Sequence, residues 1–119
     1  MKDSKGHILV VEDDKNQRGI IRIILTKEGF YVEDAGTGKA AIDLLRQNSF
    51  DVVITDLRLP DMEGTDILKE VRSQNRPSHV IIITAYGSIP SAIEATKLGA
   101  FYYLMKPFAK EVLEKKIKN

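Results

Sequence analysis

Three short runs of apolar, mostly β-branched residues constrain the fold of this chain most strongly: Ile8–Val11, Val52–Ile54 and Val80–Ile83. None of them alternates with polar residues, which is the pattern of strands buried on both faces of a parallel sheet. An aromatic run, Phe101–Leu104, and a weaker, alternating segment, Tyr31–Asp34, are candidates for two further strands, the second of them at a sheet edge. We therefore expect one parallel sheet of five strands.

The segments between these strands carry apolar residues at helical spacing. Gly29 and Gly99 follow two of the segments, where a helix would end. Strands and helices thus alternate along the chain, which predicts a doubly wound α/β fold with five helices, on both faces of the sheet. The apolar positions that mark the helices are Ile20, Ile21, Ile24 and Leu25; Ala40, Ala41, Leu44 and Leu45; Ile67, Leu68 and Val71; Ile89, Ala92 and Ile93; and Phe108, Val112, Leu113 and Ile117.

Composition excludes several classes of function. The 119 residues suit one domain, and 18 basic against 17 acidic residues give a net charge of +1, so a broad attraction for nucleic acid is not expected. The chain has no cysteine and only two histidines, His7 and His79, which excludes disulfides, thiolate chemistry and a multi-histidine metal site. No apolar run approaches the ~18 residues of a membrane span, and residues 1–6 are polar, so we expect a cytoplasmic protein that binds no membrane.

Acidic residues follow two of the predicted strands at the edge of the sheet where ligands bind in parallel α/β folds. Glu12 and Asp13 come directly after the first strand, and Asp56 closes the third. Neighbouring carboxylates repel each other unless a cation lies between or in front of them. Three carboxylates at one edge are typical of a site for a hard cation such as Mg²⁺. Asp14, next in the chain, is expected to cap the following helix, with Gln17 completing a capping box.

Two further strand ends contribute to the same edge: Thr84 follows the fourth strand and Lys106 the fifth. A lysine can neutralise a phosphate, and a hydroxyl can donate to a phosphoryl oxygen, so the five side chains together indicate a phosphoryl-transfer centre. Each residue also has an ordinary interpretation, because strands often end in Asp, Thr or a surface Lys. The glycine-rich loops that cradle nucleotides are absent, and His7 and His79 precede their strands, at the opposite end of the sheet.

Four motifs in this order closely resemble the receiver domain of two-component response regulators, which is CheY-like. The resemblance implies a flavodoxin-like sheet with strand order 2-1-3-4-5 and covers residues 7 to the end, so residues 1–119 are expected to be one receiver domain. The motifs are Ile8–Asp14, Asp51–Gly64, Ile83–Gly87 and Gly99–Phe108.

The resemblance also implies a role for each site residue. Asp56 would accept a phosphoryl group from a sensor histidine kinase, and Lys106, joined to Pro107 by a cis peptide, would pair with that group. Asp13, Glu12, Asp56 and the backbone carbonyl of Arg58 would hold the cofactor Mg²⁺. Thr84 and Tyr103 would form a switch that carries the change to the surface made by the fourth helix, fifth strand and fifth helix; the alternative interpretation of Tyr103 is a half-buried core aromatic.

A finer likeness, in Tyr86–Pro90, Ala92–Ala95 and Leu98–Phe101, is to the receivers of NtrC-like transcription activators. It implies a piece of a longer regulator whose ATPase and DNA-binding domains perform the output. The surface just named, with Ile89, Ala92, Ala95 and Tyr103, would suit a homodimer or another partner.

Two alternatives stay open. A stand-alone receiver or phosphorelay protein needs no output domain. A Mg²⁺-dependent phosphohydrolase would use the same nucleophile, but such enzymes carry a second Asp two residues later, where this chain has Arg58. As a receiver, the chain would be no enzyme beyond its own phosphorylation and dephosphorylation.

Overall fold

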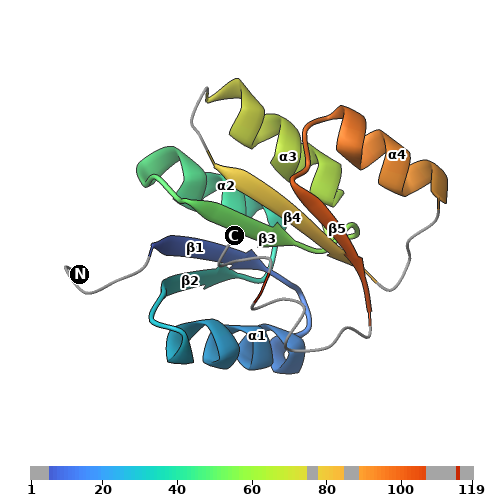
Figure 1. Cartoon of the computed structure of the whole chain (residues 1–119). Coiled ribbons are helices and arrows are strands. Elements are labelled where there is room, and N and C mark those ends of the chain that lie inside the picture. Colours follow the sequence, from blue (N-terminus) through green and yellow to red (C-terminus); the bar gives the residue numbers. More distant parts are fainter. Residues whose placement is uncertain (1–5, 75–77, 85–88, 107–114, 116–119) are drawn as a thin grey trace.

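A computed structural model of the chain describes residues 6–74, 78–84, 89–106 and 115. Five parallel strands form one sheet in the order β2-β1-β3-β4-β5 (Figure 1). The predicted strand order is therefore confirmed. The strands are β1 (His7–Val11), β2 (Tyr31–Ala35), β3 (Val52–Thr55), β4 (His79–Thr84) and β5 (Tyr102–Met105).

Four of the five predicted helices lie within the described residues: α1 (Lys15–Lys27), α2 (Gly38–Gln47), α3 (Gly64–Ser73) and α4 (Ile89–Lys97). The positions predicted for the fifth helix, Phe108, Val112, Leu113 and Ile117, lie outside those residues, as does Pro107. Helix α1 covers one face of the sheet, and α2, α3 and α4 cover the other (Figure 1). The fold is thus doubly wound, as the alternation of strands and helices predicts.

Successive residues of each central strand point to opposite faces and feed two separate cores. On the face of α1, Ile8, Ile54 and Ile81 pack with Ile21 and Leu25 of the helix. On the other face, Leu9, Val53 and Ile82 pack against α2, α3 and α4. Because both faces are covered, β1, β3 and β4 need no polar alternation, and this is why their runs are apolar throughout.

The two edge strands depart slightly from the prediction. The aromatic strand begins at Tyr102 and ends at Met105, one residue later than expected. Phe101 lies just before it, is 44% exposed and stacks against His79 with ring centroids 4.4 Å apart. In the other edge strand, the alternation is incomplete because Glu33 and Asp34 are both half-buried.

The start of α1 corrects one prediction. Asp14 is the N-cap, and its carboxylate accepts hydrogen bonds from the N–H groups of Asn16 and Gln17. The N–H of Asp14, which a capping box would direct to the Gln17 side chain, donates instead to Glu12 Oε2 at 3.1 Å. The predicted contact from Gln17 back to the N-cap is therefore wrong, because the buried carboxylate of Glu12 accepts the hydrogen bond from the Asp14 N–H instead. Among the described residues, none of the helices combines the length and apolar character needed to cross a membrane.

Candidate functional site

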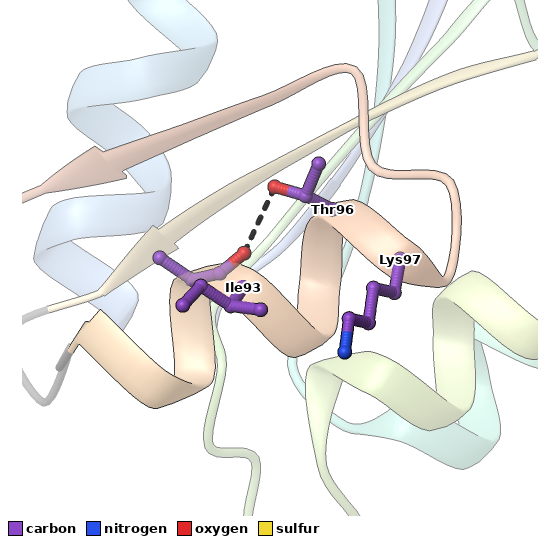
Figure 2. Close-up of a pocket in the computed structure, with 4 residues that line it drawn as sticks. Ile93, Thr96 and Lys97 are labelled. Atoms are coloured by element: carbon purple, nitrogen blue, oxygen red, sulfur yellow. Dashed lines mark hydrogen bonds between the residues drawn. The ribbon is translucent and has the colours of Figure 1, made fainter.

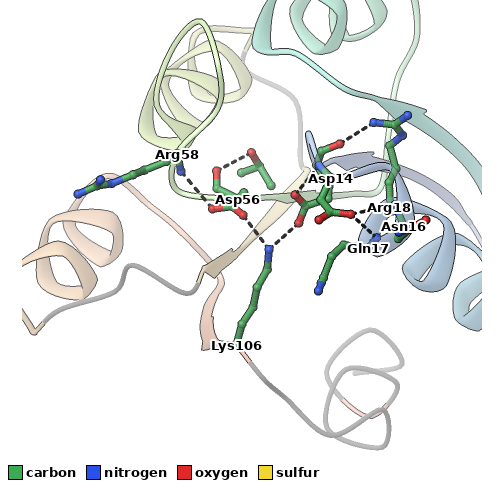
Figure 3. A network of polar contacts seen from close by, with 9 residues as sticks. Asp14, Asn16, Gln17, Arg18, Asp56, Arg58 and Lys106 are labelled. Atoms are coloured by element: carbon green, nitrogen blue, oxygen red, sulfur yellow. Dashed lines mark hydrogen bonds and ion pairs between the residues drawn. The ribbon is translucent and has the colours of Figure 1, made fainter.

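The carboxyl ends of β1, β3 and β5 bring three predicted site residues into direct contact. The ammonium of Lys106 lies between two carboxylates, with its Nζ 2.6 Å from Glu12 Oε1 and 2.8 Å from Asp56 Oδ2 (Figure 3). Parallel pairing of β1 with β3 puts Glu12 and Asp56 side by side just past the last paired residues, Val11 and Thr55. The cation that two adjacent acidic residues require is therefore supplied by a residue at the end of the sheet's fifth strand.

Asp13 joins Glu12 and Asp56 in an acidic cluster whose carboxylate oxygens lie within 4.8 Å of one another. Glu12 and Asp56 are buried, whereas Asp13 is exposed, so the cluster opens to solvent on one side. Among the described residues, Glu12 and Asp56 share the ammonium of Lys106, and Asp13 adds a third carboxylate, so the acidic groups of the cluster outnumber the cation that contacts it. This donor set fits Mg²⁺, which prefers carboxylate oxygens together with water.

Burial governs the electrostatics of the two ionic partners. Burial raises the pKa of Glu12 above its ordinary value, and this outweighs the opposing hydrogen bond from Lys106. Burial also lowers the pKa of Lys106, but the hydrogen bonds to Asp56 and Glu12 outweigh that effect, so the net pKa is raised. Lys106 therefore stays charged. A further cation near the buried Glu12 would stabilise the charged form of its carboxylate.

Local backbone contacts fix the direction of the Asp56 carboxylate. Its Oδ1 accepts a hydrogen bond from the N–H of Arg58 at 3.2 Å, while Oδ2 faces Lys106. The Arg58 side chain is exposed (Figure 3). The sequence prediction gave Arg58 a role through its carbonyl alone, and the contact through its N–H was missed. No sequence periodicity marks such a contact, since any residue type can make it.

Arg18 is a second residue that the sequence analysis missed. Its guanidinium donates to the carbonyl oxygen of Glu12 at 2.8 Å, so α1 holds the chain segment that carries Glu12 and Asp13 (Figure 3). Arg18 stands four residues after the N-cap Asp14, one helical turn into α1 and on the same side of the helix. That spacing is the signal that could have identified it.

The two proposed switch residues lie beside this centre on neighbouring strands. Thr84 ends β4 and is fully buried, and Tyr103 of β5 is half-buried against the core shared by α2, α3 and α4. In the register, Tyr103 is opposite Ile82, two residues before Thr84, so both side chains belong to the same face of the sheet. The N–H of Lys106 donates to the carbonyl of Thr84 at 2.9 Å, which ties the cation to the end of β4.

A surface pocket on α4 lies apart from this chemistry. It is lined by Ala92, Ile93, Thr96 and Lys97, and carries no carboxylate (Figure 2). The structure corrects one expectation for this region, because Ala95 is buried in the core and not part of an exposed surface. The exposed apolar residues of α4 and β5, together with the residue before β5, are Ile93, Phe101 and Met105.

Comparisons with known proteins agree with this arrangement. Residues 8–118 match the family model of the response regulator receiver domain. The chain is 37% identical over 116 residues to the transcriptional regulatory protein FixJ of Bradyrhizobium diazoefficiens, covering 98% of this chain and 57% of FixJ. It is 37% identical over 113 residues to GlrR of Escherichia coli, an NtrC-family regulator, covering 95% of this chain and 26% of GlrR. The chain thus spans between a quarter and three fifths of these two relatives.

A solved structure shares the same fold over nearly its full length. The solution structure of the beryllofluoride-activated NtrC4 receiver domain dimer superposes with a TM-score of 0.89 at 32% identity. The match covers 94% of this chain and 93% of that one. Both the expected receiver fold and the expected likeness to NtrC-family receivers are thereby confirmed.

Proposed function

Because the chain belongs to the family of response regulator receiver domains, we propose that it is a phosphorylation-dependent switch whose phosphoryl group is carried by Asp56. This family is one of signalling domains rather than metabolic enzymes. The observation that carries the assignment is the position of Lys106 between Glu12 Oε1 and Asp56 Oδ2. Glu12 and Asp56 share this contact and both belong to the acidic cluster, and the resemblance to receiver domains assigns the phosphoryl group to Asp56.

In the proposed reaction, a carboxylate oxygen of Asp56 attacks the phosphorus of a phosphohistidine on a sensor kinase. The new O–P bond forms as the N–P bond breaks, and the released imidazole takes a proton from water. Lys106 stays within reach of the Asp56 carboxylate and offsets the charge that the phosphoryl group brings. Catalysis of this kind depends mainly on positioning and electrostatics, which the contacts to Lys106 and to the Arg58 N–H supply.

The residues that would hold Mg²⁺ are Glu12, Asp13, Asp56 and the carbonyl of Arg58. The ion would offset negative charge on the phosphoryl oxygens during transfer. The support is the donor set itself, since three carboxylates lie together and only one ammonium contacts them among the described residues.

The readout would pass through Thr84 and Tyr103 to the surface of α4 and β5. A phosphoryl group adds close to two negative charges, and a hydroxyl at the end of β4 could donate to it. Because Tyr103 and Thr84 share one face of the sheet, a shift of Thr84 would change the packing around Tyr103. The exposed Ile93 and Met105 then give that surface apolar side chains for a partner, either an output domain or a second copy.

We further propose that the output is control of transcription in a longer regulator, because FixJ and GlrR are transcriptional regulatory proteins that extend well beyond the matched part. A free-standing receiver is the alternative. The coding sequence that flanks these 119 residues distinguishes the two.

The proposed function is tested by incubating the chain with acetyl phosphate and Mg²⁺ and measuring its intact mass. We expect a gain of one phosphoryl group, which Asp56→Asn abolishes. Asp51→Asn is the matched control, because Asp51 is an exposed aspartate just before the same strand, and its carboxylate accepts from the backbone N–H of His7 at the opposite end of the sheet. No mass gain in the wild-type chain, or an unchanged gain in Asp56→Asn, would refute the proposal.

A further inference from the structure

The loop between β3 and α3, residues 57–63, is a small closed hairpin. The N–H of Leu59 donates to the carbonyl of Met62 at 2.9 Å, and Arg58 forms an antiparallel bridge with Glu63. At its base, the Arg58 N–H holds Asp56 Oδ1. A movement of this hairpin as a unit would therefore move the group that orients the Asp56 carboxylate.

The tip of the hairpin is fastened to the first turn of α2. Asp61 Oδ1 accepts from the N–H of Gly38 at 2.8 Å, and Oδ2 accepts from the N–H of Lys39 at 3.0 Å. Thr37 accepts the next two N–H groups of the helix, so all four N–H groups of the first turn have partners. The two backbone donors hold the pKa of Asp61 below its ordinary value, so its carboxylate remains charged near the positive end of the helix.

A second contact joins the same two elements. A Cβ atom on Gly38 would lie 2.3 Å from Cγ of Met62, so the absence of a side chain at Gly38 lets Met62 lie directly on the helix start. Met62 is half-buried and packs against the core on that face of the sheet. Asp61 and Met62 thus attach the hairpin tip to the start of α2, Asp61 by hydrogen bonds to Gly38 and Lys39 and Met62 by packing on Gly38.

We propose that Asp61 is a positioning residue for the phosphoryl-transfer centre: by anchoring the hairpin to α2, it holds the backbone of Arg58 in place against Asp56. The inference rests on the proposed function and extends it to a residue that touches neither phosphoryl group nor metal. When the Asp61 hydrogen bonds are lost, the hairpin tip is held to α2 by the packing of Met62 alone, and both the Arg58 N–H and the Arg58 carbonyl are less firmly fixed. Misplaced outer contacts of this kind weaken metal binding without removing a ligand.

The competing explanation is that Asp61 only caps α2. Thr37→Ala is the matched control, because among the described residues the Thr37 hydroxyl bonds the N–H of Ala40 at the same helix start, whereas Asp61 belongs to the hairpin itself. Both variants would lower stability, but only loss of the anchor would alter the centre at Asp56. The two explanations therefore differ in the Mg²⁺ dependence of phosphorylation.

The experiment measures Mg²⁺ binding directly by isothermal titration calorimetry and, beside it, the initial rate of phosphoryl incorporation from acetyl phosphate over a series of Mg²⁺ concentrations. For Asp61→Ala we expect the half-saturating Mg²⁺ concentration to rise about tenfold, the lower end of the range for such outer contacts. Thr37→Ala is expected to stay within about twofold of wild type. Asp61→Asn keeps one acceptor oxygen, so it should give an intermediate shift, and it serves in place of Asp61→Ala if that variant fails to fold.

Unchanged Mg²⁺ dependence in the Asp61 variants, or an equal shift in Thr37→Ala, would overturn this inference and leave the proposed function intact. A wild-type chain that incorporates no phosphoryl group would overturn the proposed function, and this inference with it.

Discussion

At both ends of the sheet a carboxylate contacts a nitrogen-bearing side chain of another strand or strand end, but the two contacts differ in how far the carboxylates are buried. At the amino end, His7 Nε2 lies 2.6 Å from Glu33 Oε2, and the Glu33 side chain is 28% exposed. At the carboxyl end, the side chains of Glu12 and Asp56 that face Lys106 are only 4% and 7% exposed. Water screens the first contact, whereas the second depends almost entirely on protein groups.

The surroundings of the two contacts differ as well. The ring of His7 contacts the rings of Tyr31 and Phe50, at centroid distances of 4.7 and 4.3 Å, and the backbone N–H of His7 donates to Asp51 Oδ2. The polar groups of His7 at the amino end are thus hydrogen-bonded to neighbouring protein groups, as is usual on a protein surface. At the carboxyl end, the acidic cluster retains excess negative charge and opens toward solvent through Asp13. Buried charge without local balance therefore distinguishes a binding site from a structural contact in this fold.

Replacing Lys106 tests this distinction most severely. Lys106→Ala leaves Glu12 and Asp56 buried without their cation, and we expect a loss of about 3 kcal/mol in the free energy of unfolding. Urea denaturation in the presence of EDTA measures it. Lys69→Ala, at an exposed lysine of α3, should change stability by less than about 0.5 kcal/mol. A loss of similar size in both variants would contradict the comparison.

Close backbone packing at the carboxyl end is tested by Gly64→Ala. A Cβ at this position would lie 2.2 Å from the carbonyl oxygen of Asp56, which is backbone and cannot rotate away. We expect a loss of about 2 kcal/mol, measured by thermal or urea denaturation. Gly19→Ala in α1 is the matched change, because nothing lies within 4 Å of its Cβ. Gly19→Ala should instead raise the free energy of unfolding by about 1 kcal/mol, because alanine favours a helix more than glycine does. If both variants stabilised the chain, or both destabilised it, the result would be evidence against this packing.

At the amino end, Glu33→Gln is expected to have a small effect. The amide can still face His7, and the position is partly solvated, so the loss of stability should remain below about 1 kcal/mol. Phosphoryl incorporation from acetyl phosphate should proceed at the wild-type rate, because the contact lies at the opposite end of the sheet. A slower incorporation would show that the two ends are coupled.

The smallest expected effect concerns pH and Asp61. The N–H groups of Gly38 and Lys39 lower the pKa of Asp61 in the folded chain, so its stabilising contribution is complete above the ordinary aspartate value of ~3.9. As the pH falls through the lowered folded pKa, that contribution disappears. The urea midpoints of wild type and Asp61→Asn should therefore differ at neutral pH and converge in acid. A difference that persists unchanged in strong acid would exclude this cause.

The sequence predicts the central fold well, because strands that are buried on both faces appear in it as continuous apolar runs. The strands β1, β3 and β4 follow from their apolar runs, with β1 and β4 each starting at the histidine just before its run. The edge strand β5 was misplaced by one residue, since Phe101 is aromatic yet stacks on His79 outside the strand.

The proximity of the site residues also follows from the sequence, because the carboxyl ends of parallel strands meet at one edge. Helical spacing from Asp14 is the one sequence signal for Arg18, but the sequence could not show which partners Arg18, the Arg58 N–H and Asp61 contact. Each joins segments through the three-dimensional path of a loop or helix, and none repeats with a period that a sequence displays.

The separation of Lys106 from Glu12 along the chain has a consequence for folding. The two residues are 94 positions apart, and β5, which precedes Lys106, pairs with β4 alone on its inner side. A folding intermediate in which β1, β3 and β4 are assembled but β5 is still undocked would contain the acidic residues without their ammonium. Under the proposed function, such an intermediate would lack the ammonium beside Asp56, and we expect it to accept a phosphoryl group poorly until β5 pairs with β4.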